Sequence, residues 1–198
     1  AQFISLLSKI YKLFPDEYFK EKLEETINYI NNNFINKELN LLGSAYDADS
    51  EGEEGKYYTF YFEEIKNIKN IEKHYDISKH GNWEGKIILR ELTQPSKEIK
   101  KKLLEIRKTR KKPFFDKKVQ LDLNCIWISS LINAYESCNN EEYLKLAEKY
   151  YQNLEKKFYK KKIFHSYSEN HVFLEDYAYF IQMLLDLYDV TLNISYKL

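Results

Sequence analysis

The sequence predicts an all-α protein of the α/α toroid type, with a small β-strand insertion near residues 56–90. Helices that are apolar on most sides alternate with helices that carry a single apolar stripe, and the connections within each pair are short whereas those between pairs are long. Apolar residues recur at helical spacing in five segments: residues 1–14, 17–34, 119–137, 141–158 and 173–190.

The first two segments define the repeating unit. Residues 1–14 are apolar on nearly all sides, which predicts a helix that is buried on most sides, and residues 17–34 have one apolar stripe opposite charged residues. Residues 119–137 and 141–158 repeat this order, and residues 173–190 begin a third pair. We therefore expect helical hairpins with one inner and one half-exposed member.

A weaker hairpin is expected from residues 62–75 and 97–110. It is interrupted by a turn at residues 81–85, and strands are expected at residues 56–61 and 86–90. A single hairpin cannot cover its inner helix, so hairpins of this kind pack side by side into a ring or a solenoid. The uneven connections favour the toroid over the alternative, a repeat solenoid.

The totals limit the function classes. A chain of 198 residues suits one domain, and 31 basic residues balance 31 acidic ones, so neither nucleic acid nor an anionic membrane is an expected partner. Cys125 and Cys138 lack metal-type spacing, which predicts reduced thiols and a cytoplasmic setting. We see no signal peptide or membrane span. The sequence begins without Met inside an apolar pattern, so we expect a piece of a longer protein.

The long connections are expected to share one rim of the ring. They cover residues 35–61, 111–118 and 159–172, and each precedes an inner helix. The positive end of a helix dipole favours anions and polarised oxygens at such a place. The polar motifs of the three connections are therefore expected around one mouth.

The first connection contains an acidic loop at residues 44–55, with five carboxylates and two glycines. It is either a solvated turn, a calcium loop or part of a sugar site. Asp47 and Asp49 occupy the first and third positions of an EF-hand pattern, but Tyr58 stands where a bidentate Glu is needed, which disfavours an EF-hand. In a sugar site Asp47 and Asp49 would accept hydroxyl hydrogens and Tyr58 would stack on the sugar, although ordinary aromatic packing also explains Tyr58.

The second connection offers Asp116, which is either a helix N-cap or a carboxylate of the mouth. Asp122 and Asn124 follow within the inner helix. Asn124 needs a hydrogen-bond partner in an otherwise apolar helix, and we assign it to substrate binding at the interior of the ring.

The third connection offers His165 and Tyr167, followed by Glu175, Asp176 and Tyr177. Glu175 and Asp176 either complement the helix dipole or act as general acid or base in glycoside chemistry. His165 is a candidate proton carrier, and Tyr167 and Tyr177 are candidate substrate-binding residues.

Other functions are disfavoured. The four histidines lack ligand spacing, so we expect no metal, and no motif calls for a cofactor. A basic run over residues 100–112 lacks interleaved aromatic residues until Phe114, which favours a solvated outer face over a nucleic-acid patch.

Five motifs of the chain resemble those of a known family, in order and over nearly the whole length. They are Ser44–Gly55 (similar to S-A-E-D-A-D-S-E-G-E-E-G), Lys56–Ile65, Gly81–Leu89, Pro113–Asn124 and His165–Ala178. The family is the spermatogenesis-associated protein 20 group, also called YyaL-like or thioredoxin-domain-containing proteins. Four positions depart from its pattern: Tyr46, Lys117, Leu123 and Cys125.

The resemblance implies a longer protein in which a thioredoxin-like domain precedes a toroid similar to six-hairpin glycosidases and N-acylglucosamine 2-epimerases. The chain would then be an internal part of that toroid, and the thioredoxin-like domain would be a partner. The leading hypothesis is a carbohydrate-binding or carbohydrate-processing domain. The alternative is a non-catalytic scaffold for the thioredoxin-like domain.

Overall fold

The computed structural model describes residues 1–158, 163–167 and 171–196. It divides the chain into two compact units. Unit 1 comprises Ala1–Ala45 and Phe115–Leu198, and unit 2 comprises Tyr46–Phe114. Unit 2 is therefore an insertion in the sequence of unit 1, and the two are described separately below.

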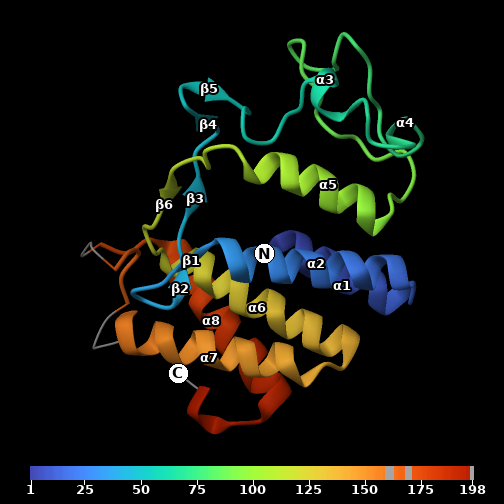
Figure 1. Cartoon of the computed structure of the whole chain (residues 1–198). Coiled ribbons are helices and arrows are strands. Elements are labelled where there is room, and N and C mark those ends of the chain that lie inside the picture. Colours follow the sequence, from blue (N-terminus) through green and yellow to red (C-terminus); the bar gives the residue numbers. More distant parts are fainter. Residues whose placement is uncertain (159–162, 168–170, 197–198) are drawn as a thin grey trace. The chain divides into compact units, whose positions relative to one another are not determined.

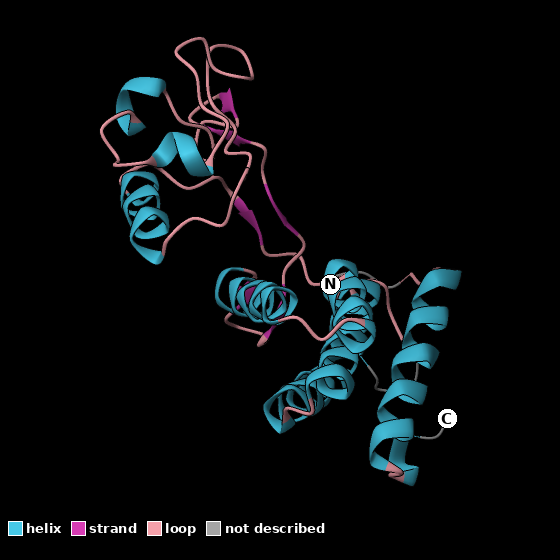
Figure 2. Ribbon diagram, turned by 90° about the vertical axis from the view of Figure 1, so that its right-hand side faces the viewer, coloured by secondary structure: helices cyan, strands magenta, loops and turns pink. Residues whose placement is uncertain are grey.

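Unit 1 consists mainly of long helices (Figures 1 and 2). These are α1 (Gln2–Leu13), α2 (Glu17–Asn33), α6 (Leu121–Cys138), α7 (Glu141–Phe158) and α8 (Leu174–Thr191), followed by a 3₁₀ helix, η1 (Ile194–Tyr196). The structure confirms the prediction of a mainly helical protein, and the five helices begin and end within two residues of the predicted segments.

Helix α6 is the centre of unit 1, because it packs against α1, α7 and α8. Its buried side chains include Trp127, Ile128 and Leu131, all with no exposed surface. Helix α7 buries its stripe of Ala147, Tyr150 and Leu154 and leaves its charged face in water, as its single apolar stripe predicts.

Helix α1 differs from the prediction of a helix that is buried on most sides. Ile4 and Leu7 are buried, whereas Phe3, Leu6 and Leu13 are more than half exposed. Only the face of α1 toward the core of unit 1 is covered by the described residues.

Three short strand pairs complete the fold. In unit 1, β1 (Ile35–Asn36) pairs antiparallel with β2 (Leu41–Leu42), with Ile35 opposite Leu42. In unit 2, β4 (Asp49–Ser50) pairs antiparallel with β5 (Glu53–Glu54). The third pair joins β3 (Ala45–Tyr46) and β6 (Phe115–Asp116).

Unit 2 has its own small core, which includes Phe60, Ile65, Ile87 and Leu103. Its helices are α3 (Phe62–Ile65), α4 (Ile71–His74) and α5 (Lys97–Lys108). The expected helix over residues 62–75 is thus two short helices, with Asn70 in the left-handed conformation between them.

The predicted strands at residues 56–61 and 86–90 are wrong. Residues 56–59 form a turn, in which the backbone N–H groups of Tyr58 and Thr59 both donate to the carbonyl of Gly55. An isolated antiparallel bridge between Phe60 and Ile87 is what remains of the expected pairing. No described helix is long and apolar enough to cross a membrane.

Candidate functional site

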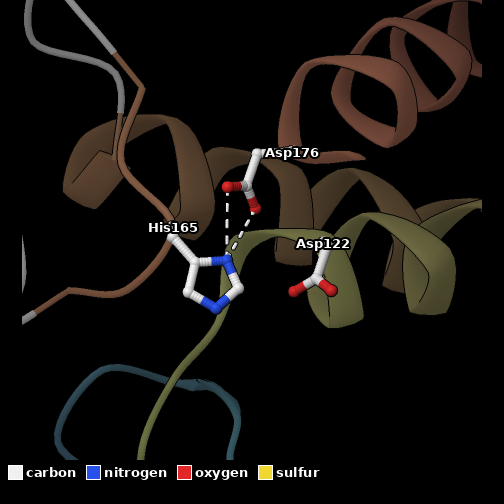
Figure 3. Close-up of side chains that lie close together, drawn as sticks. All are labelled: Asp122, His165 and Asp176. Carbon is white, nitrogen blue, oxygen red and sulfur yellow. Dashed lines mark hydrogen bonds and ion pairs between the residues drawn. The ribbon is translucent and has the colours of Figure 1, made fainter. Parts of the chain in front are cut away.

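Three ionisable side chains of unit 1 meet where α6 and α8 begin. Asp122 lies in the first turn of α6 and Asp176 in the first turn of α8, and these helices pack against each other. His165 approaches from the loop before α8 (Figure 3). We call these three residues the Asp–His–Asp cluster.

Backbone pairing places His165 in the cluster. The N–H of Leu121 donates to the carbonyl of His165 at 2.8 Å, and the N–H of Tyr167 donates to that of Val119 at 3.2 Å. The N–H of His165 donates to the carbonyl of His171 at 2.8 Å. The segment around His165 is therefore fixed along the residues that lead into α6.

The imidazole of His165 faces Asp176. Its Nδ1 atom lies 3.0 Å from Oδ1 and 3.2 Å from Oδ2 of Asp176 (Figure 3). Asp176 has no exposed surface, and its Oδ2 also accepts a hydrogen bond from the N–H of Phe173 at 2.8 Å, which caps α8. Asp176 therefore has a structural role and also holds His165 in place.

Asp122 completes the cluster without being held in the same way. One ligand atom from each of the three residues lies within 4.8 Å of the others. The Oδ1 atom of Asp122 is buried and has no hydrogen-bond partner among the described residues. A buried carboxylate oxygen without a donor is costly, so this atom is available to a proton, a cation or a ligand.

The other ring nitrogen of His165 belongs to a hydrogen-bonded chain. His165 Nε2 lies 2.9 Å from the side-chain amide of Gln120, which in turn lies 2.9 Å from Oγ of Ser44. Ser44 Oγ donates to the carbonyl of Lys118 at 2.6 Å or to Oε1 of Gln120 at 2.9 Å. The NH₂ of Gln120 faces Nε2 of His165 and donates to it, so Nε2 is an acceptor.

The ring proton of His165 therefore lies on Nδ1, because a bare lone pair on Nδ1 would face the carboxylate of Asp176. The cluster combines two carboxyl groups with one imidazole. The same three residues could hold a metal ion, which would take the place of the proton on Nδ1.

The negative charge of the cluster acts on the thiol beside it. Burial, followed by the charges of Asp122 and Asp176, raises the pKa of Cys125. Cys125 has no exposed surface and is therefore a core residue rather than a nucleophile.

The acidic loop forms the β4–β5 hairpin of unit 2, and two of its three glutamates are paired with lysines. Glu51 lies 3.0 Å from Lys56, and Glu53 pairs with both Lys56 and Lys86. The hydrogen bond from Lys86 is the main cause that lowers the pKa of Glu53. Glu51 and Gly52 form the tight turn with positive φ, as in a hairpin rather than a calcium loop.

The remaining predicted site residues of unit 2 are exposed or packed locally. Asp47 and Asp49 are exposed, and Tyr58 makes an edge contact with Tyr57 at 5.0 Å between ring centroids.

Asp116 and Asn124 have backbone partners. Asp116 does not cap α6, as one interpretation expected: its Oδ1 accepts from the N–H of Lys118 at 2.9 Å, and Gln120 is the N-cap residue. Asn124 is fully buried and pairs with both backbone groups of Leu42.

The other residues predicted around the third connection are exposed. Tyr167 and Tyr177 are about half exposed, and Glu175 lies on the exposed side of the first turn of α8. Parts of that connection, residues 159–162 and 168–170, lie outside the described residues. Of the predicted site residues, the structure brings His165 and Asp176 together.

Three residues of the site had no assigned role in the sequence prediction. Asp122 was noted as polar without a function, and Gln120 and Phe173 were not singled out. The ring of Phe173 is 45% exposed and lies 4.8 Å from that of His165. The available signal was that Asp122 and Asp176 each occupy the first turn of an inner helix.

No protein-family model matches the chain, and no curated protein matches it.

Proposed function

We propose that unit 1 is part of an α/α toroid that binds or processes carbohydrate, with the Asp–His–Asp cluster as its reactive centre. The observation that carries the proposal is that the carboxylate of Asp122 lies within 4.8 Å of the imidazole of His165, which the buried Asp176 holds in place. A carboxylate beside an imidazole supplies a nucleophile or base together with a proton carrier.

Burial divides the roles among the three residues. Asp176 is fully buried, so it is a positioning residue that holds the imidazole of His165. His165, once protonated, would donate a proton to the leaving oxygen of a glycoside. The carboxylate of Asp122, which is half-buried, would accept a hydroxyl hydrogen or attack the sugar carbon. The exposed ring of Phe173 would stack on an apolar sugar face.

The toroid and the family belong to the same proposal. The alternation of inner and half-exposed helices supports a ring of hairpins, and the five motifs support a relation to the spermatogenesis-associated protein 20 group. In that case the thioredoxin-like domain would lie elsewhere in the same protein, in a cytoplasmic setting.

The test measures binding and turnover separately. Saturation-transfer NMR with a panel of neutral mono- and oligosaccharides reports binding, and release of the aryl group from activated aryl glycosides reports turnover. We expect Asp122→Asn and His165→Gln to lower turnover by about 10²–10⁴-fold, the usual contribution of a general acid or base.

The control is Asp189→Asn, which changes an exposed aspartate at the other end of α8. It should leave binding and turnover unchanged. If no sugar binds to the wild-type chain, or if Asp189→Asn has the same effect as Asp122→Asn, the carbohydrate proposal is wrong. Sugar binding without turnover would leave a carbohydrate-binding domain and remove the catalytic roles.

A scaffold for the thioredoxin-like domain is the second candidate. It is favoured by apolar side chains that the described residues leave exposed on α1 and α8, namely Phe3, Leu6, Leu13, Leu174, Ile181 and Leu185. Isothermal titration of the chain with a separately produced thioredoxin-like domain would test it. The informative variants are Ile181→Ser and Leu185→Ser, which should weaken the association without changing any sugar binding.

A further inference from the structure

Unit 2 contains a cavity of about 340 Å³, within the range of small-molecule sites. Its lining includes the apolar residues Tyr58, Phe60, Ile88 and Leu104, together with two cations, Lys100 and Arg107. All lie within unit 2, so the cavity is complete without any other part of the chain.

The cavity keeps apolar surface in contact with water. Tyr58, Ile88 and Leu104 are 39%, 41% and 42% exposed, although each has an apolar side chain or ring. Covering such surface with the apolar part of a ligand is favourable, because it removes both surfaces from water.

One face of α5 adds charge to this apolar surface. Lys100, Leu103, Leu104 and Arg107 are spaced at i, i+3, i+4 and i+7, so they lie along one side of the helix. The two cations therefore flank the leucines, and an anionic group of a ligand in the cavity can reach Arg107.

Arg107 has no carboxylate partner among the described residues. The guanidinium lies 5.6 Å from the ring centroid of Tyr57 and 5.9 Å from that of Tyr58. Lys102 instead pairs with Glu98 at 2.8 Å, and Arg110 pairs with Glu64 at 2.8 Å. These contacts with the rings hold the guanidinium near the cavity and leave its N–H donors available to an anion.

We propose that this cavity binds a small amphipathic anion, with an aliphatic or aromatic body against the apolar lining and a carboxylate on Arg107. A carboxylate suits the planar donor fork of arginine. A bounded cavity with cations on one helix face favours a small molecule over a membrane, which would need an extended basic and apolar surface. This site is independent of the carbohydrate proposal for unit 1.

The experiment compares octanoate with 1-octanol, which share a chain and differ in the charged group. Both are titrated into the full chain below the octanoate micelle concentration and followed by chemical shifts of unit 2. We expect saturable binding of octanoate at the cavity, and binding of 1-octanol that is weaker by about fivefold to tenfold, as expected for one charge-assisted contact.

Two variants of α5 make the test specific. Arg107→Gln should weaken octanoate binding by about fivefold to tenfold and leave 1-octanol unchanged. Lys101→Gln removes an exposed charge on the same helix, outside the cavity, and should change neither. Far-UV circular dichroism establishes that both variants are folded.

The proposal is overturned if octanoate does not saturate, or if octanoate and 1-octanol bind equally and Arg107→Gln has no effect. It is also overturned if octanoate fails while vesicles of phosphatidylcholine and phosphatidylglycerol bind the chain through α5. That result would assign α5 to a membrane surface.

Discussion

At the scale of single residues, the polar side chains at the start of α6 are of two kinds. Some form hydrogen bonds with buried backbone groups, and others have an atom that can still bind a proton, a cation or a ligand. Asn124 belongs to the first group: its Oδ1 accepts from the N–H of Leu42 at 2.8 Å and its Nδ2 donates to the carbonyl of Leu42 at 3.1 Å. Asp122, which precedes it in the first turn, belongs to the second. Burial of a polar residue in a helix therefore does not by itself indicate a ligand site.

Replacing Asn124 should destabilise unit 1 strongly. Asn124→Ala would leave both backbone groups of Leu42 buried without partners, and we expect a loss of about 3 kcal/mol in the free energy of unfolding. Asn133→Ala is the control, because Asn133 is half-buried and donates to the carbonyl of Ser129 in its own helix and to the side chain of Ser5, rather than to the backbone of another segment. Urea unfolding followed by circular dichroism measures both. Equal losses would show that Asn124 is not a structural brace.

The protonation of His165 is a second prediction at this scale. We expect the ring proton on Nδ1 and none on Nε2 in ¹⁵N-edited NMR spectra, because Asp176 accepts from Nδ1 and the NH₂ of Gln120 donates to Nε2. Asp176→Asn should remove the proton from Nδ1. A bare Nδ1 in the wild-type chain, with signals that shift when a chelator is added, would instead indicate a cation in the cluster.

The buried thiol of Cys125 predicts loss of stability at alkaline pH. Its pKa is raised in the folded state by burial, so unfolding at high pH releases a proton that the folded chain retains. Below about pH 8.5, the pKa of an ordinary thiol, Cys125 does not make the free energy of unfolding depend on pH. Above that pH the free energy of unfolding falls by up to about 1.4 kcal/mol per pH unit. Burial also raises the pKa of Tyr150, to about 12, so Tyr150 adds to the fall in the free energy of unfolding above about pH 10.

Urea midpoints between about pH 7 and about pH 10 check this prediction. Cys125→Ala should be less stable at neutral pH, because it leaves a small cavity, but should show a shallower decline above about pH 8.5. A decline as steep as that of the wild-type chain would mean that Cys125 does not contribute.

At the scale of elements, periodicity predicted the long helices well and the strands poorly. Helix α7 begins and ends where its apolar stripe does, because a stripe of one residue per helical turn persists over several turns. The aromatic run at residues 57–61 is equally compatible with a strand or a packed turn. The turn is stabilised by Arg110, a residue far away in the sequence, whose guanidinium donates to the carbonyls of Lys56, Tyr57 and Thr59.

Two glycines in neighbouring turns of unit 2 offer a matched test of such local structure: Gly81 ends the turn that begins at Ser78, and Gly85 lies in the turn from Trp83 to Lys86. Gly81 and Gly85 both have positive φ, at 71° and 76°. A Cβ atom on Gly81 would lie 2.3 Å from the carbonyl oxygen of Lys86, whereas a Cβ on Gly85 would meet nothing within 4 Å. Both alanine variants carry the cost of a left-handed residue, about 1 kcal/mol, but Gly81→Ala adds a clash with the backbone.

We therefore expect Gly85→Ala to keep unit 2 folded and Gly81→Ala to unfold it. Trp83, which begins the turn that contains Gly85, reports unfolding of unit 2 through its fluorescence. Hydrogen exchange at Phe60 and Ile87 reports the loss of the β-bridge between them. Identical behaviour of the two variants would contradict a steric role of Gly81.

At the scale of the whole molecule, the candidate site could be predicted in part. His165 and Asp176 follow from polar residues placed before an inner helix. Asp122 does not, since its free oxygen depends on which donors the fold brings near, and those come from segments far apart in sequence. Likewise, the separate unit at Tyr46–Phe114 depends on its long-range core contacts, which no local pattern reveals.

The separation of the two cores gives the last prediction. The core of unit 1 includes no residue between Leu42 and Val119, and that of unit 2 lies within Phe60–Leu103. Unit 2 can therefore be deleted to test whether unit 1 folds alone.

The N–H of Ser44 donates to the carbonyl of Asp116 at 3.1 Å, so the two ends left by the deletion, Ala45 and Phe115, can be joined by a linker of about two residues such as Asn-Gly. We expect the shortened chain to fold and to unfold cooperatively, with Trp127 as its reporter. It should also keep the ring proton of His165 on Nδ1. Gly81→Ala in the full chain is the independent control, because it disrupts unit 2 without removing it. If both changes abolish the His165 signals, unit 1 depends on unit 2 and the cluster cannot be assigned to unit 1 alone.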